Sequence, residues 1–378
     1  MLPERVRRLA SNPTVELGWD GQRLERTELA VAFRIQARAC AEHGSALYAA
    51  LLGRAAEDVE AGGPLAALLE GWEGHPLLDA LGLRLLGGIH RLVLAGEAPG
   101  LARHYPSADG VADADAAWGE LRALVAARAE ALRPCLAEPV QTNEVRRSTV
   151  LLGGFLHVAA RTGLPLRLLE IGSSAGLNLL FDRYAYDLSG ARWGDPRSPV
   201  RLAAPWRGTL PPLAATLAVA SRAGCDRSPL DVSDPAQRLR LESFLWPDQP
   251  ERLALLRAAV AVAQVDPPRL ARRSAAAWLG EVLAEPTPGC ATVVFQSVVW
   301  LYFSELERCE VTRLVEAAGL RAHESAPLAW LRLEGADLSG AELRLRSWPG
   351  GEDRLLAHTD YHGREAEWLG GDTVPAPR

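Results

Sequence analysis

The sequence contains no lysine, so all 41 of its basic residues are arginine, and 47 acidic residues outnumber them. The formal net charge of −6 gives no basic surface of the kind that nucleic-acid-binding domains carry, and we expect no nucleic-acid partner. Arginine in place of lysine, together with heavy use of alanine, leucine and glycine, indicates GC-rich coding rather than a function.

Cysteine is scarce, and no pair has the C-x-x-C spacing of a zinc or redox motif. Five widely spaced thiols predict a reduced protein without structural zinc. Long apolar runs are also absent: the longest uncharged stretch, residues 286–304, carries polar residues in its middle, which favours a buried strand over a membrane span. No apolar signal core follows the first arginines. We therefore expect a cytoplasmic location and no membrane partner.

The chain has an ample apolar content of 48% and two regions of different periodicity. Residues 1–160 show helical patterns separated by Gly and Pro clusters, which predicts an all-helical N-terminal domain or lid. In residues 161–378 short apolar runs alternate with helical stretches, which predicts a Rossmann-like α/β domain. Residues 187–212, rich in Gly, Pro, Trp and Arg, are predicted to be an inserted loop in that domain.

The second domain is organised around residues 166–178, L-R-L-L-E-I-G-S-S-A-G-L-N. The apolar run from Leu166 predicts a buried parallel strand, and apolar spacings of three and four from Leu177 predict a helix. Small residues at 172–176 join the two. In a strand, loop and helix unit of this kind, free backbone N–H groups at the helix N-terminus face a nucleotide-like ligand.

Two chemistries fit this loop. Glu170, Gly172 and Gly176 match the acid-x-Gly-x-x-x-Gly signature of class I methyltransferases, in which the glycines let the backbone approach S-adenosylmethionine and the acid orders the loop. The loop also satisfies Gly-x-Ser-x-Gly, the nucleophile elbow of serine hydrolases, with Ser174 as nucleophile. A tight turn that binds nothing is a third interpretation, because short glycine motifs are weak signals.

A second polar segment, residues 139–148, has seven polar or charged side chains in ten positions before an apolar helix. One interpretation is an N-cap made by Thr142 or Asn143, with Glu144 in the first turn. The other interpretation places this helix start over the glycine loop, where its polar side chains contact ligand or substrate. Both can be true, because a capped helix end is a rigid place for polar groups.

Two further strand ends complete the predicted site. Residues 217–221 predict a second strand leading to Asp226, and an acid after the second strand of a doubly wound sheet commonly binds ribose hydroxyls. Asp226 lies 50 residues past Gly176, a separation that the inserted loop must explain. A weak third strand is predicted at 270–275 and a strong fourth at 292–296. The aromatic residues that follow the fourth strand are predicted either to line a substrate site or to pack in the core.

The tail changes period and predicts three more strands, at residues 328–334, 342–348 and 354–361. The last two are joined by the turn Pro-Gly-Gly-Glu-Asp. A mostly parallel seven-stranded sheet with a terminal antiparallel hairpin is therefore expected. His358, Asp360 and His362 alternate in a way that would suit a metal, but an antiparallel last strand carries them away from the ligand edge. We expect no metal site there.

Five motifs, taken as a set, are specific. They are V-Q-T-N-E-V-R-R from Val140, L-E-I-G-S-S-A-G-L-N-L-L-F-D-R-Y from Leu169, G-C-D-x-x-P-L-D from Gly224, W-P-D-Q-x-x-R from Trp246 and the closing His-Gly at 362. This set resembles an uncharacterised bacterial family, the domain of unknown function 2332. The resemblance implies a class I methyltransferase-like fold with a helical N-terminal region, and it implies no established reaction.

The sequence therefore predicts a methyltransferase that uses S-adenosylmethionine on a small-molecule acceptor. A cofactor-binding module without catalysis is the alternative, and a serine hydrolase is disfavoured because helices, not strands, precede the loop. The residues predicted to bind the cofactor are Glu170, Gly172, Ser173, Ser174, Gly176, Asn178, Asp226 and Gln296. Those predicted to contact substrate or form a lid are Gln141, Thr142, Asn143, Glu144, Arg146 and Ser297.

Overall fold

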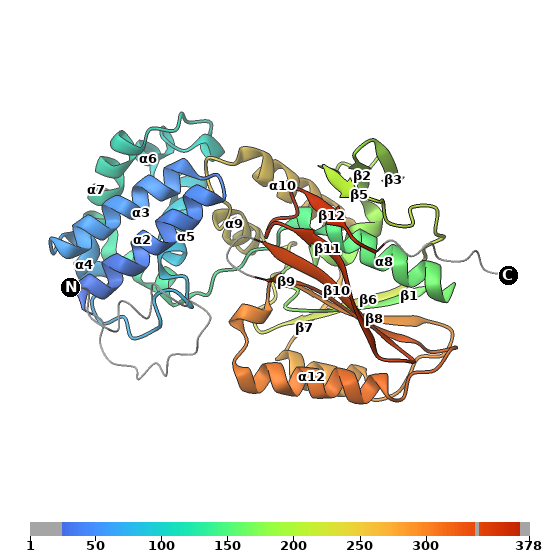
Figure 1. Ribbon diagram of the computed structural model, residues 1–378. Helices are drawn as coiled ribbons and strands as arrows, with labels where there is room; N and C mark the ends of the chain where they lie inside the picture. Colours follow the sequence, from blue (N-terminus) through green and yellow to red (C-terminus); the bar gives the residue numbers. More distant parts are fainter. Residues whose placement is uncertain (1–24, 337–339, 371–378) are drawn as a thin grey trace. The chain divides into compact units, whose positions relative to one another are not determined.

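The computed structural model describes residues 25–336 and 340–370, which divide into two compact units (Figure 1). The first unit holds the described residues up to Thr142 together with Asp234–Ala254, and the second holds Asn143–Ser233 and the described residues from Leu255 onward. Helix α8 (Ser148–Thr162), which the sequence analysis grouped with the N-terminal helices, lies in the second unit. No helix in these ranges is both long enough and apolar enough to cross a membrane.

The first unit is helical, as predicted. Its helices are α2 (Arg26–Glu42), α3 (Ala46–Glu60), α4 (Pro64–Leu68), α5 (Leu81–Leu94), α6 (Pro99–Ala102), η1 (Pro106–Ala108), α7 (Ala114–Ala137) and α9 (Pro235–Ser243). Apolar residues at spacings of three and four, such as Leu86, Ile89 and Val93 of α5, point into one shared core. Helices packed on helices bury these stripes without any sheet.

Residues 234–254 join this helical unit through specific contacts. Asp248 accepts hydrogen bonds from Ser45 Oγ at 2.6 Å and from the backbone N–H of Leu47 at 2.9 Å, so it caps α3. Trp246 packs against Tyr48, with ring centroids 6.5 Å apart. The W-P-D-Q motif therefore stabilises a helix that lies about 200 residues earlier in the chain. Helix α10 (Pro250–Val265) begins in the first unit and continues into the second.

The second unit is built on a nine-stranded sheet in the order β5-β12-β11-β10-β9-β8-β1-β6-β7. The strands are β1 (Leu166–Ile171), β5 (Trp206–Gly208), β6 (Val219–Asp226), β7 (Arg269–Arg272), β8 (Ala291–Ser297), β9 (Leu328–Gly335), β10 (Ala341–Trp348), β11 (Glu352–Thr359) and β12 (Ala366–Trp368). Strands β7, β6, β1, β8 and β9 are parallel, and β10 and β11 form an antiparallel hairpin.

The predicted mixed α/β fold with a large, mostly parallel sheet is thus confirmed, but the sheet has nine strands and not the predicted seven. The two extra strands, β12 and β5, extend the sheet beyond the hairpin. Each is three residues long, and three residues are too few for an alternating pattern to be recognised.

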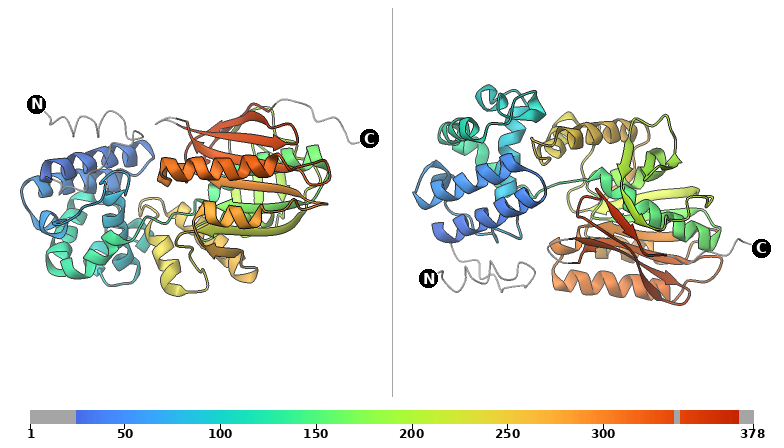
Figure 2. Two further views of the ribbon diagram at one scale, coloured as in Figure 1. Left: turned by 90° about the horizontal axis from the view of Figure 1, so that it is seen from below. Right: turned by 45° about the horizontal axis from the view of Figure 1, so that its top comes forward.

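Helices cover both faces of the sheet (Figures 1 and 2). Helix α8 is apolar nearly all round and buried, and Phe155 on it packs against Phe181 and Phe295 at centroid distances of 4.2 and 5.1 Å. The opposite face is covered by α11 (Ala275–Val282) and α12 (Glu305–Gly319), which bury Val294 of the sheet beside Trp278 and Val311.

Two segments differ locally from the expectations. Residues 187–212, predicted as an inserted loop, carry most of a separate three-stranded sheet of β2 (Ala185–Leu188), β3 (Ala191–Gly194) and β4 (Arg201–Ala204). The helix predicted after Gly176 is a short 3-10 helix, η3 (Leu177–Arg183). Tyr184 Oη donates to the Leu177 carbonyl at 2.6 Å and Arg222 Nη1 to that of Leu179 at 2.8 Å, so side chains bind carbonyls that a longer α-helix would use.

Candidate functional site

The strand order reverses between β1 and β8. From β1 the chain continues to β6 and β7 on one side of the sheet, and then to β8 and β9 on the other. In open α/β sheets ligands bind beyond the carboxyl ends of the strands at such a reversal. The segments placed there are the glycine loop, residues 172–176, and the segment after β8, residues 298–303.

The glycine loop is a tight turn held by the end of β6. Gly172, Ser174 and Gly176 have φ angles of +66°, +51° and +71°, in the left-handed region. Asp226 accepts hydrogen bonds from the backbone N–H groups of Ser174 at 3.0 Å and of Ser228 at 2.8 Å. The half-buried Asp226 carboxylate, predicted to bind ribose, therefore lies beside the loop and fixes its conformation.

Protein side chains fill the space beside both glycines. A Cβ atom on Gly172 would lie 2.3 Å from Val299 Cγ2, and one on Gly176 would lie 2.7 Å from Pro268 Cγ. These glycines are thus required by their backbone angles and by the close approach of Val299 and Pro268. On the side where a Cβ would point, they make room for protein side chains and not for a ligand.

Three buried polar atoms around the loop lack a hydrogen-bond partner among the residues that the structure describes. They are Glu170 Oε2, Ser173 Oγ and Asn178 Nδ2. Burial raises the pKa of Glu170 well above its ordinary value, the nearby charge of Asp226 raises it further, and Arg147 opposes both. Buried polar groups are nearly always paired, so three unpaired atoms in one loop motif are an exception that needs an explanation.

The second polar motif is in contact with this loop through Asn143. Asn143 Oδ1 accepts a hydrogen bond from the backbone N–H of Leu177 at 2.9 Å, at the start of η3. Glu144 caps the adjoining 3-10 helix η2 (Val145–Arg147) by accepting from the backbone N–H of Arg146 at 3.2 Å. Asn143 and Glu144 are both buried, so this segment is more than a solvent-exposed cap. Gln141 and Thr142 belong to the first unit.

Two arginines follow in the same motif. Arg146 is half-buried, and its Nε lacks a hydrogen-bond partner in the described ranges. Arg147 is buried and donates from Nε to the carbonyl of Tyr361 at 2.9 Å and from Nη1 to that of Ser297 at 3.1 Å. It thereby connects η2 to the end of β8 and brings the backbone of Ser297 beside the second motif.

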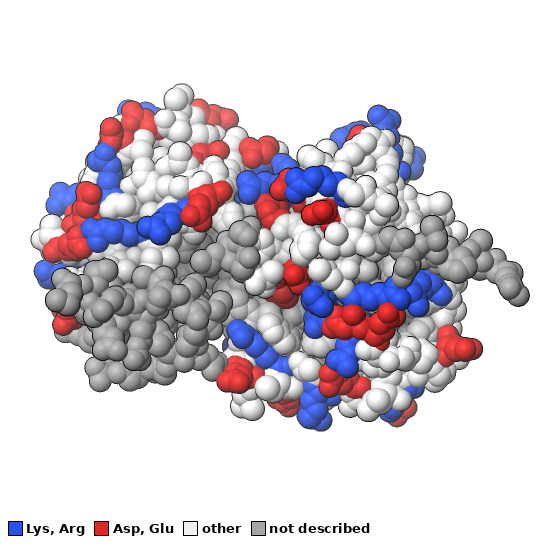
Figure 3. All heavy atoms as spheres, viewed as in Figure 1, with Lys and Arg blue, Asp and Glu red and all other residues white. Residues whose placement is uncertain are grey.

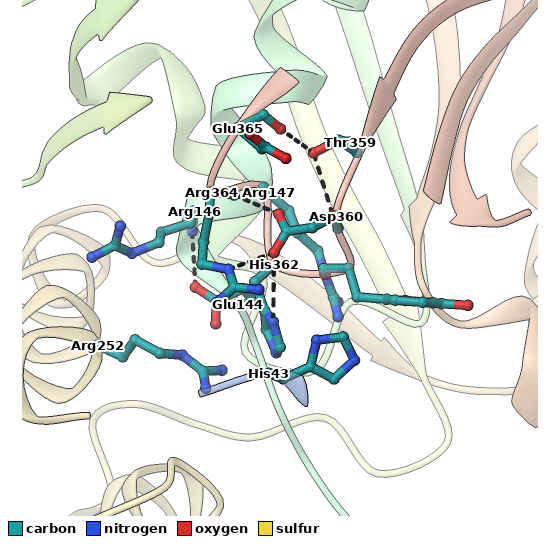
Figure 4. A network of polar contacts seen from close by, with 12 residues as sticks. His43, Glu144, Arg146, Arg147, Arg252, Thr359, Asp360, His362, Arg364 and Glu365 are labelled. Carbon is teal, nitrogen blue, oxygen red and sulfur yellow. Dashed lines mark hydrogen bonds and ion pairs between the residues drawn. The ribbon is translucent and has the colours of Figure 1, made fainter. Parts of the chain in front are cut away.

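The closing His-Gly motif packs on the same helix start (Figure 4). Thr149 Oγ1 donates to the carbonyls of Arg146 at 2.6 Å and Gly363 at 3.0 Å. Asp360 accepts from the backbone N–H and Nε of Arg364 at 2.7 and 2.6 Å, and these bonds lower the pKa of the Asp360 carboxyl despite its burial. Motifs more than 200 residues apart in the sequence therefore form one polar network.

The end of β8 is held by a carboxyl that the sequence analysis did not select. Gln296 is fully buried, donates from Nε2 to Glu334 Oε1 at 3.0 Å and accepts from Trp330 Nε1 at 3.0 Å. Glu334 also accepts from the backbone N–H groups of Val299 and Trp300, each at 3.2 Å. Burial raises the pKa of Glu334 to about 7, against these hydrogen bonds.

The segment after β8 is bent and partly aromatic. Val298 has a φ of +52°, which is rare for a β-branched residue and marks local strain. Trp300 lies in η4 (Trp300–Tyr302) and packs on Phe303 and Trp330, with ring centroids 5.7 and 5.9 Å away, whereas Tyr302 is 52% exposed. Trp300 and Phe303 thus belong to a packed cluster.

His358, Asp360 and His362, where no metal site is expected, lie on a strand and in the turn after it. His358 lies on β11, its Nδ1 4.0 Å from Glu342 Oε1, and Asp360 and His362 lie in the turn that follows. Within residues 25–336 and 340–370, no three His, Cys, Asp or Glu side chains are placed to hold a metal ion.

Two residues that matter to this geometry, Arg147 and Glu334, were missed from the sequence. Arg147 stands inside the motif V-Q-T-N-E-V-R-R beside the selected Arg146, and the sequence gives no means of choosing between neighbours. Glu334 had a usable signal. It is an acid at the carboxyl end of a predicted parallel strand, the position that directed attention to Asp226 and Gln296.

Comparisons with known proteins add a family and no activity. No curated protein and no solved structure matches the chain. The family model described as an uncharacterized protein conserved in bacteria, DUF2332, matches residues 30–368. This range includes the helical unit, the glycine loop, the second polar motif and the closing His-Gly. The chain therefore belongs to the DUF2332 family.

Proposed function

We propose that the second unit binds S-adenosylmethionine beside the glycine loop and transfers its methyl group to a small-molecule acceptor. The observation that carries this proposal is the set of three buried, unpaired polar atoms on Glu170, Ser173 and Asn178. All three belong to one loop motif at the strand-order reversal, where a ligand is expected. A polar ligand would satisfy atoms that the protein alone leaves unpaired.

The strand order supports a nucleoside cofactor. The parallel strands β7, β6, β1, β8 and β9 follow the 3-2-1-4-5 order of doubly wound sheets, and Asp226 ends the second strand of that order. In this arrangement Asp226 would hold the ribose hydroxyls, while Asn178 Nδ2 would donate to the cofactor and Glu170 would accept from it. When bound, S-adenosylmethionine supplies an electrophilic methyl group.

Thermal unfolding with S-adenosylhomocysteine tests the cofactor. A ligand at 100 times its dissociation constant stabilises the folded state by roughly 2.7 kcal/mol, so the unfolding temperature should rise by several degrees. Ser173→Ala is the matched variant. It removes an unpaired hydroxyl, so the ligand-free protein should lose little stability, whereas the shift with ligand should shrink. No shift at millimolar S-adenosylhomocysteine would reject the cofactor.

Two other functions are distinguished by further measurements. A cofactor-binding module without catalysis would show the thermal shift and no methyl transfer from labelled S-adenosylmethionine to any acceptor pool. A serine hydrolase is favoured only by the left-handed φ of Ser174, and it is disfavoured because only helices, and no strands, precede β1 among the described residues. Labelling of wild type, but not of Ser174→Ala, by a fluorophosphonate would establish the hydrolase instead.

A further inference from the structure

Helix α12 carries a row of regularly spaced side chains on the face opposite its core side. Its buried residues, among them Val311 and Val315, face the sheet. On the opposite face Leu306, Glu310, Arg313, Ala317 and, just after the helix end, Leu320 have the four-and-three spacing of a heptad seam, with leucines at the two ends and charges in the middle. Leu306 is 78% exposed and Leu320 85% exposed, so both leucines are accessible to a partner.

The charges on this seam are also unpaired. Other ionic groups on the helix are bound within the protein: Glu307 pairs with Arg227, and Glu316 with Arg346. On the face of the second unit shown in Figure 3, arginine and acidic side chains are interspersed, and Asp353 pairs with both Arg332 and Arg344. Glu310 and Arg313, by contrast, have no hydrogen bond or ion pair within the described ranges.

We infer that the exposed seam of α12 is a self-complementary surface on which a second copy of this chain docks, with the two α12 helices antiparallel. In the register that places Glu310 against Arg313 of the other copy, the two-fold axis also places Arg313 against Glu310, so both charged pairs form at once. The same register places Leu306 against Ala317, and Leu320 beside the segment that carries the exposed Tyr302.

The surroundings of the seam suit a helix as partner. A surface depression of about 650 Å³ runs beside it, lined by Arg313, Ala317 and Leu320 of the seam and by Trp300. A single pair of 15-residue helices is a small interface, so we expect a weak dimer, with a dissociation constant in the micromolar range. The depression shares Trp300 with the segment after β8, but the inference rests on Glu310 and Arg313 of α12 and not on the proposed cofactor.

Sedimentation velocity over a range of protein concentrations tests the inference. Wild type should show a monomer–dimer equilibrium. Arg313→Glu places like charges opposite each other twice, and it should raise the dissociation constant at least tenfold, as should Glu310→Arg. The double variant Glu310→Arg with Arg313→Glu restores opposite charges, and its dissociation constant should return to within a few-fold of wild type. Arg161→Glu, which reverses an exposed arginine on α8, is the matched control and should change nothing.

Chemical cross-linking gives a second measurement. Cys309 lies beside the seam and is the one exposed cysteine of the described part, whereas Cys290 is partly exposed and the other three are buried. A short thiol cross-linker should couple two copies of wild type but not of Cys309→Ser. A protein that stays monomeric at several hundred micromolar would overturn the inference, and so would a dimer that tolerates both single charge reversals, because another surface would then form it.

Discussion

Two carboxyls near the strand-order reversal, the half-buried Glu334 on β9 and the buried Glu170 on β1, differ in how fully the polar groups around them are hydrogen-bonded. Glu334 accepts hydrogen bonds from three groups at and after the end of β8: the side-chain amide of Gln296 and the backbone N–H groups of Val299 and Trp300. In the motif that contains Glu170, three polar atoms have no hydrogen-bond partner in the described part of the chain. The proposal that a ligand binds beside the glycine loop rests on this difference, because buried polar groups are nearly always paired.

The glycine loop and the segment after β8 also meet, and the contact between these two segments gives the largest expected effect. Gly172→Ala introduces a Cβ 2.3 Å from Val299 Cγ2 at a φ of +66°, so both packing and backbone are strained. We expect a loss of roughly 4 kcal/mol in the free energy of unfolding, measured by urea denaturation.

Gly163→Ala is the matched control, because Gly163 has nearly the same φ of +64° and nothing within 4 Å of its Cβ position. It should cost only about 1 kcal/mol. If Gly172→Ala costs no more than Gly163→Ala, the Val299 contact does not hold the two segments together. Val299→Ala combined with Gly172→Ala should recover part of the loss, since it removes the clashing methyl groups.

The second prediction concerns the pH dependence of stability that Glu334, which binds the segment after β8, should produce. The pKa of Glu334 is raised by burial from 4.5 to about 7 in the folded protein, so the folded state binds this proton more tightly than the unfolded chain does. The contribution of Glu334 to the free energy of unfolding is therefore at its maximum below about pH 4.5. It falls by roughly 3 kcal/mol as the pH rises through about 7.

Glu334→Gln keeps a neutral side chain of the same shape at every pH. Unfolding free energies measured between pH 4.5 and 8 should therefore fall less steeply for Glu334→Gln than for wild type. The difference between the two proteins isolates this carboxyl from Glu170, whose pKa is shifted in the same direction. Parallel curves for the two proteins would show that Glu334 does not titrate in this range.

The third prediction is that replacing a buried carboxyl, that of Glu170, stabilises the protein and does not destabilise it. Glu170 is buried, its Oε2 is unpaired, and its pKa is raised well above the ordinary value. Glu170→Gln should therefore stabilise the ligand-free protein at pH 8 by about 1 kcal/mol, because a group that resists ionisation is removed. If the loop binds a ligand, the same variant should weaken the stabilisation by S-adenosylhomocysteine. A destabilised Glu170→Gln variant would mean that this carboxyl serves the fold.

Much of the fold was accessible from the sequence because its signals are local. The apolar run 292–296 predicted β8, and the change to an alternating period predicted β9, β10 and β11. What could not be predicted depends on distant pairing. Strand β12 is defined by its partners β11 and β5, and residues 234–254 join the first unit through Asp248 and Trp246.

Prediction of the candidate site from the sequence was limited in the same way, to features that are local along the chain. The loop and the polar segment could be recognised from the sequence, because their small residues and clustered polar side chains are adjacent along the chain. It could not show that Val299 fills the space beside Gly172, since that contact joins the ends of two strands. It also could not show that η3 would be short, because the carbonyls of η3 are bound by side chains from elsewhere in the unit.

The smallest effect is expected at Asn143, which joins the polar segment to the glycine loop. Asn143 Oδ1 accepts from the Leu177 backbone N–H, so Asn143→Ala leaves that buried donor unpaired and should cost about 1 kcal/mol. Thr142→Ala is the control: Thr142 is exposed and should matter little. Hydrogen exchange sharpens the test. The Leu177 amide should exchange faster in Asn143→Ala than in wild type, while amides in β8 keep their protection. If Thr142→Ala is the more costly change, the segment only caps a helix and does not support the loop.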